Sequence, residues 1–194
     1  VRVRLHPDDP VALELGDGAD VDVAPDCELV GRRLSRDPYT TATGQHETEV
    51  EPDSLTVGRT TVATFQVGRR VDGGADNIGF AVSSDDGRTW RSGLLPALTL
   101  ESEPPGLHVR ASDPVVGYDA TTRTWLISTL AIQNQITRLT ISRSSDGLTW
   151  SSPVTAIEGF SSTGVVFDKN WVACDNGATS PKRGRCYLVY TDTV

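Results

Sequence analysis

Three acidic residues, Glu51, Asp113 and Asp168, each lie at the start of an expected β-strand. Carboxylates in such positions can act as a general acid or base, or as oxygen ligands for a hard cation such as Ca²⁺. The alternative is that each carboxylate caps backbone groups where its strand begins, with Pro52 and Pro114 fixing the entry of the chain. The residues alone leave both interpretations open, so these three are candidate catalytic residues only.

Three arginines are candidates for binding an anionic ligand. Arg69 and Arg70 follow an expected middle strand, and Arg110 lies three residues before Asp113. A guanidinium group matches a carboxylate in a planar, bidentate manner, which makes arginine suitable for such recognition. The alternative is that they are solvated surface residues. The histidines His6, His46 and His108 show no metal-ligand spacing, and no zinc site is expected.

Composition limits the classes of partner. The chain has 194 residues, 37% of them hydrophobic, which is enough to bury a core. Its formal net charge of -8 argues against a nucleic-acid partner. No run of about eighteen apolar residues occurs, so no helical membrane span is expected. The sequence begins at Val1 and contains no Met, so we expect a processed start or a piece of a longer protein.

A repeat organises most of the chain. The segment from Ser83 to Trp90, Ser-Ser-Asp-Asp-Gly-Arg-Thr-Trp, recurs in shortened form from Ser144 to Trp150. Each copy follows three short runs rich in β-branched and aromatic residues, and a third copy opens near Asp168. The expected strands are 51–57, 60–67 and 77–83, then 113–119, 124–131, 137–142 and 154–157, then 168–173 and 185–191.

The repeated turn has a structural explanation. An Asp can accept hydrogen bonds from backbone groups of its own turn, and Gly supplies positive φ at no steric cost. The second copy departs from the first: aligned on its Gly and Trp, Ser145 takes the Asp position, whereas aligned on Asp146 the turn is one residue short. We therefore expect a looser or differently bonded second turn. The residues assigned a structural role are Ser83, Asp85, Gly87, Thr89, Trp90, Gly147, Thr149 and Trp150.

These patterns predict an all-β protein, a partial β-propeller of four-stranded antiparallel blades. About two complete blades and part of a third are expected. The predicted divisions are an extended leader with short strands over 1–45, a blade over 46–105 with its turn at 83–90, a blade over 106–160 with its degenerate turn at 143–150, and an incomplete blade over 161–194.

The order Ser-x-Asp-x-Gly-x-Thr-Trp resembles the Asp-box of sialidase-like (BNR-repeat) propellers of the secreted type. The segments Asp168-Lys169-Asn170-Trp171 and Ser180-Pro181 are similar to the same group, and the resemblance covers about residues 46 to 192. It implies glycans or glycoconjugates as ligands of a central funnel, and a secreted or cell-surface location. It implies no required cofactor, although a structural Ca²⁺ is an option, and it places the remaining blades outside this chain.

Sialidases of this family hold the substrate carboxylate with three arginines, use a Tyr activated by a Glu as nucleophile and protonate the leaving oxygen with an Asp. The family's Arg-Ile-Pro motif does not occur in this sequence. We therefore expect a glycan-binding or glycan-processing fragment with an incomplete catalytic set. The alternatives are an exo-α-sialidase-type glycoside hydrolase and a non-catalytic, protein-binding propeller.

The three cysteines are too few for a disulfide scaffold. In a secreted protein the plausible bridge joins Cys174 to Cys186, and Cys27 has no evident partner. The alternative is three free thiols.

Overall fold

The computed structural model describes residues 33–160 and 166–193. Contacts within the chain divide it into two units, Val1–Arg33 and Leu34–Val194, and all the described strands lie in the second unit. Its described residues contain ten β-strands and no helix, so the prediction of an all-β, antiparallel fold is confirmed. Likewise, they contain no helix long and apolar enough to cross a membrane. Residues 1–32 of the expected leader, including Cys27, lie outside the described residues.

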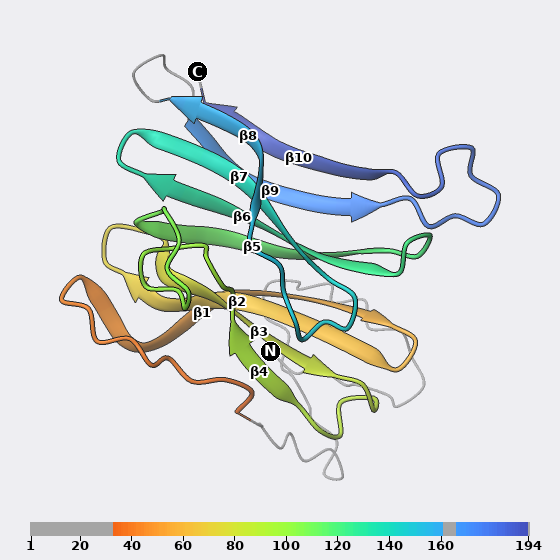
Figure 1. Cartoon of the computed structure of the whole chain (residues 1–194), viewed down its shortest axis with the longest axis horizontal. Helices are drawn as coiled ribbons and strands as arrows, with labels where there is room; N and C mark the ends of the chain where they lie inside the picture. The colour runs from red at the N-terminus through yellow and green to blue at the C-terminus, as the bar shows by residue number, and fades with distance from the viewer. Residues whose placement is uncertain (1–32, 161–165, 194) are drawn as a thin grey trace, which may run out of the picture. The chain divides into compact units, whose positions relative to one another are not determined.

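The strands follow one another as antiparallel neighbours. The first group is β1 (Gly44–Val57), β2 (Thr60–Arg70), β3 (Ala75–Ser83) and β4 (Arg91–Leu94). The second is β5 (Arg110–Asp119), β6 (Thr124–Gln133), β7 (Ile136–Ser144) and β8 (Val154–Phe160). A single pairing, Ala75 with Ala111, joins β3 to β5. The strands β9 (Val166–Cys174) and β10 (Cys186–Thr193) form a separate two-stranded sheet (Figure 1).

The main core lies between the two four-strand groups. One face of β2 and β3 packs against β5, β6 and Trp150, and the ring centroids of Phe80 and Trp150 are 5.9 Å apart. Burying each large apolar side chain contributes about 1.5–3 kcal/mol, so this face is a main source of stability. The buried members are Val62, Ile78, Phe80, Val82, Leu95, Leu98, Ala111, Val116, Trp125, Ile127, Ala131 and Trp150.

The β9–β10 sheet packs on the second group through two smaller clusters. Val172 joins Val115 and Leu126, and Phe167 joins Leu130 and Leu139. Each of these cores therefore forms between the facing sides of two successive strand groups.

The turn from Ser83 to Trp90 is a closed hydrogen-bonded unit. The Asp85 carboxylate accepts bonds from the Thr89 N–H at 2.8 Å, the Thr89 hydroxyl at 2.6 Å and the Ser83 hydroxyl at 2.9 Å. The Gly87 N–H donates to the Ser83 hydroxyl, and the Trp90 ring N–H donates to the Gly87 carbonyl.

The second turn keeps the same bonds although it is one residue shorter. Asp146, rather than Ser145, accepts from the Thr149 N–H and hydroxyl, and Ser144 takes the part of Ser83. The Asp146 carboxylate also accepts from the Leu148 N–H at 2.8 Å. We expected this turn to be looser or differently bonded; it is bonded as closely as the first, with Asp146 at its centre and one residue fewer in the loop.

Candidate functional site

A β-bulge interrupts the first strand of each repeat at the same place. On β1, Glu51 and Pro52 lie between the paired residues Val50 and Asp53, opposite a single residue of β2. The pairs Asp113-Pro114 on β5 and Lys169-Asn170 on β9 lie in equivalent register shifts. Such bulges bend a strand and re-aim a side chain, and they are over-represented next to active sites.

The first residue of each bulge has a left-handed backbone. The φ angles are 52° at Glu51, 47° at Asp113 and 44° at Lys169. A non-glycine residue in this region costs about 1–3 kcal/mol, and such residues cluster at functional sites. The third member differs from the expected carboxylate: the register aligns Asp168 with Ser112 and places Lys169 at the bulge. Asp168 is exposed, and its carboxylate accepts a bond from the Lys169 N–H at 2.9 Å.

Hydrogen bonds connect the two carboxylates through a buried amide. The Gln66 side chain, which is fully buried, donates to the Glu51 carboxylate and to the Ser112 hydroxyl, 3.0 Å away. The Ser112 hydroxyl in turn donates to the Asp113 carboxylate at 2.9 Å. Because Gln66 has no access to water, its orientation is set by these partners, and it fixes one carboxylate relative to the other.

Glu51, Gln66, Ser112 and Asp113, together with Lys169, form what we call the carboxylate row. The Lys169 ammonium lies 3.5 Å from the Asp113 carboxylate, and these side chains are 66% and 12% exposed respectively. Asp113 is therefore largely buried and is paired with an exposed positive group. The next residue, Asn170, is fully buried and donates to the Ser128 hydroxyl at 2.8 Å, while its own carbonyl oxygen has no hydrogen-bond partner.

The three candidate arginines gather around the β2–β3 turn. Arg69 donates to the side-chain amide oxygen of Gln66 at 3.3 Å and to the Gly74 backbone carbonyl at 3.1 Å. Arg110 donates to the carbonyls of Asp72 and Gly73 and forms an ion pair with the Asp72 carboxylate at 2.6 Å.

Arg70 forms an ion pair at 2.7 Å with Asp76, which is fully buried. These bonds stabilise the turn, and of the three arginines Arg69 is the one that contacts the carboxylate row through Gln66. Ligand binding by any of the three stays a prediction.

Sequence reasoning missed three members of the row, namely Gln66, Ser112 and Lys169. The sequence does contain a signal for Lys169, because aligning Ser112-Asp113-Pro114 with Asp168-Lys169-Asn170 makes the lysine equivalent to Asp113. No comparable signal identifies Gln66, whose role depends on burial. Within the described ranges, no three His, Cys, Asp or Glu side chains come together as a metal site, and a bound Ca²⁺ stays a prediction.

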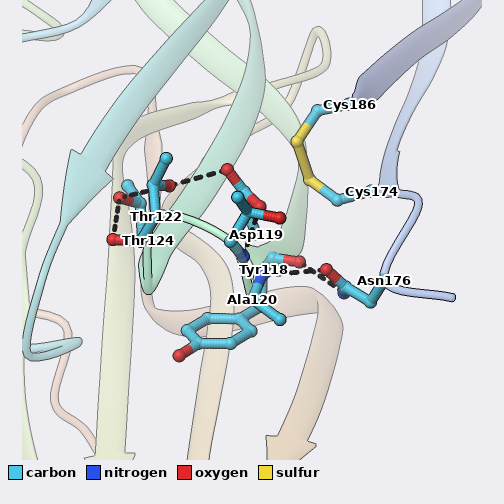
Figure 2. The surroundings of a disulfide bond; sticks show 9 residues. Tyr118, Asp119, Ala120, Thr122, Thr124, Cys174, Asn176 and Cys186 are labelled. Atoms are coloured by element: carbon cyan, nitrogen blue, oxygen red, sulfur yellow. Dashed lines mark hydrogen bonds between the residues drawn. A yellow bond between two sulfur atoms is a disulfide. The ribbon is translucent and has the colours of Figure 1, made fainter. Parts of the chain in front are cut away.

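A hollow lies between the β6–β8 strands and β10. It has a volume of about 410 Å³. Beside it, the disulfide Cys174–Cys186 closes the loop between β9 and β10 (Figure 2). The Asn176 side chain fastens this loop to the end of β5, because it donates to the Tyr118 carbonyl and accepts from the Ala120 N–H, both at 2.8 Å.

Comparison with known proteins gives partial structural matches. No protein-family model matches the chain, and no curated protein matches it significantly. An exo-β-1,3-galactanase from Phanerochaete chrysosporium is 11% identical, with a TM-score of 0.48 over 82% of this chain and 36% of that protein. A putative glycoside hydrolase from Parabacteroides distasonis is 15% identical, with a TM-score of 0.39 over 56% of this chain and 32% of that one.

A structure from work on the GH130 family of mannoside phosphorylases, which contains glycoside hydrolases that target β-1,2-mannosidic linkages, is 18% identical with a TM-score of 0.39, over 56% of this chain and 32% of that one. The chain thus spans about a third of the length of these solved structures. All three were described as, or in connection with, glycoside hydrolases.

Proposed function

We propose that this chain is part of a sialidase-like β-propeller that binds or processes glycans at the row of bulges in β1, β5 and β9. The observation that supports the proposal is the hydrogen-bonded connection from Glu51 through Gln66 and Ser112 to Asp113. Each four-strand group corresponds to one blade, and the bulged first strands are the innermost. The remaining blades belong to a longer parent molecule.

The chemistry of the row suits a sugar. The Glu51 and Asp113 carboxylates and the Lys169 ammonium lie together, and each can exchange hydrogen bonds with sugar hydroxyls, while the buried Gln66 amide holds the carboxylates in place. Two carboxylates on either side of a glycosidic bond are also the usual means of hydrolysing it. A secreted or cell-surface location fits this proposal, because the Cys174–Cys186 disulfide persists in an oxidising compartment.

Binding without turnover is the preferred form of the proposal for this chain. The three arginines already bond to the β2–β3 turn or to Asp76, so a substrate carboxylate would have to compete with these partners. The exo-α-sialidase alternative would need that exchange. The protein-binding alternative would leave the buried bridge through Gln66 without a chemical role.

A glycan array followed by titration of the strongest ligand tests the proposal. Glu51→Gln and Asp113→Asn should each weaken glycan binding by about tenfold or more, since charged hydrogen bonds of this kind contribute about 1.5–3 kcal/mol. Asp168→Asn is the matched control and should bind as the wild type does, because its carboxylate bonds to its own neighbour's backbone. Failure of the wild type to bind any glycan would disprove the proposal.

A fluorogenic sialoside separates binding from catalysis. We expect no product above a boiled control. Turnover that Asp113→Asn abolishes would instead establish the sialidase alternative.

A further inference from the structure

The β9–β10 loop, residues 175–185, is fastened to the end of β5 by the Asn176 side chain. Its Nδ2 donates to the Tyr118 carbonyl and its Oδ1 accepts from the Ala120 N–H, both at 2.8 Å (Figure 2). An amide can make both bonds because it carries a donor and an acceptor side by side. An ionised carboxylate in its place has no donor, so the bond to the Tyr118 carbonyl would be lost.

The residue that follows Asn176 is Gly177, and both residues are exposed. The backbone nitrogen after an Asn can attack the side-chain carbonyl carbon of that Asn, and glycine hinders the attack least because it has no Cβ. The Gly177 N–H donates to the Asp175 carboxylate at 3.0 Å, so an acceptor for its proton is already in place. No other asparagine of the chain is followed by glycine.

We propose that Asn176 is a site of spontaneous deamidation, and that the reaction releases the β9–β10 loop from the end of β5. The Gly177 nitrogen forms a bond to Cγ of Asn176, and the bond from Cγ to Nδ2 breaks. The leaving nitrogen takes up the Gly177 proton, passed on by the Asp175 carboxylate, and departs as ammonia. Water then opens the succinimide ring at either of its carbonyls, which gives aspartate or isoaspartate. Water is thus the only co-reactant.

Either product weakens the attachment of the loop. The aspartate has no N–H for the Tyr118 carbonyl, and the isoaspartate also lengthens the backbone by one carbon, which displaces the acceptor of the Ala120 N–H. The Cys174–Cys186 disulfide is not touched by the reaction, so β9 and β10 stay joined and the change is confined to the loop. Asp113 lies near the other end of β5, so the proposal is independent of glycan binding.

Incubation of the full chain at mildly alkaline pH and body temperature tests the reaction. Peptide mass spectrometry should find a gain of about 1 Da in the peptide that contains Asn176, with isoaspartate among the products. Asn134 is the matched control within the chain, because it is also exposed but is followed by Gln135, and it should remain an amide. Gly177→Ala should slow the gain by about tenfold, since a methyl group hinders the attacking nitrogen. The new methyl carbon would lie 3.2 Å from the Asp175 carboxylate and from Ser180 Cβ, which a small shift of the exposed loop relieves.

Hydrogen exchange measures the release of the loop. The Ala120 amide should exchange at least about tenfold faster in the deamidated fraction than in fresh protein, because its acceptor is no longer held in place. Asn176→Asp reproduces one product and should show faster exchange without any incubation. The proposal is overturned by the absence of a mass gain at Asn176, by an equal rate of gain in Gly177→Ala, or by unchanged exchange at Ala120 in the deamidated fraction.

Discussion

The carboxylates of Asp85 and Asp146, at the centres of the two repeated turns, each accept at least three hydrogen bonds. The hydroxyl and the N–H of Thr89 lower the pKa of Asp85 to about 2, from an ordinary value of 3.8. The N–H of Thr149 is the main cause of a still lower pKa at Asp146. Since each bond stabilises the ionised form, both turns depend on a negative charge at their centre.

Lowering the pH should therefore reduce the stability of the wild type more than that of a variant without the charged carboxylate. A carboxyl whose pKa is depressed in the folded state contributes stability above the unfolded pKa, near 3.9, and loses it as the pH falls toward the folded value. Asp85→Asn should lower the melting temperature at pH 6, and the gap to wild type should close between about pH 4 and about pH 2. Thermal unfolding at several pH values measures it. A gap independent of pH would contradict the role of the charge.

At the scale of residues the sequence predicted the turns but not every position that matters. It identified Asp85, Gly87 and Trp90 from spacing, because a turn is a local structure. It could not decide between Ser145 and Asp146, since that choice depends on where β7 ends. The sequence analysis placed Asp168 at the position that Lys169 occupies in the bulge. The error is one residue of register, and register depends on the pairing of β9 with β10, which a local sequence pattern does not contain.

At the scale of elements, one cross-strand position is filled differently in each repeat. The residues pair as Thr56 with Thr61, Tyr118 with Trp125, and Cys174 with Cys186. The first pair shares a hydrogen bond of 2.8 Å, the second is a tilted aromatic pair with ring centroids 4.7 Å apart, and the third is a disulfide. The covalent pair joins β9 and β10, the two strands of the third repeat that lie within the described residues.

The disulfide should therefore stabilise the β9–β10 hairpin measurably. It closes a loop with a sequence separation of 12, for which chain entropy predicts a contribution of about 2–3 kcal/mol. The double variant Cys174→Ser with Cys186→Ser should lose about that much free energy of unfolding in urea. Reducing the wild type should have the same effect and should not change the variant. A denaturing thiol titration should count one free thiol, and a count of three would exclude the bridge.

Strand boundaries show what local patterns cannot predict. Glu51-Pro52 and Asp113-Pro114 suggested strand starts, because proline lacks an N–H for the ladder. In the structure β1 begins at Gly44 and β5 at Arg110, and each proline lies inside its strand at a bulge, where no ladder bond is required of it. The same bulges that made the starts of β1 and β5 hard to predict also position the side chains of the carboxylate row.

At the scale of the whole described part, stability depends on how each strand group covers the next. Trp150 is 7% exposed in the core between the first two groups, whereas Trp171 is 49% exposed on the outer sheet. The chain thus contains two tryptophans in opposite surroundings, which makes a matched comparison.

Trp150→Ala should reduce the free energy of unfolding by about 3–5 kcal/mol, the usual cost of removing a buried tryptophan. Trp171→Ala should cost about 1 kcal/mol or less, since half of its side chain already faces solvent. Urea unfolding followed by far-ultraviolet circular dichroism measures both without depending on tryptophan fluorescence. Equal losses, or a Trp150→Ala transition split into two steps, would show that the groups fold independently. A single, strongly shifted transition is the result that joined cores require.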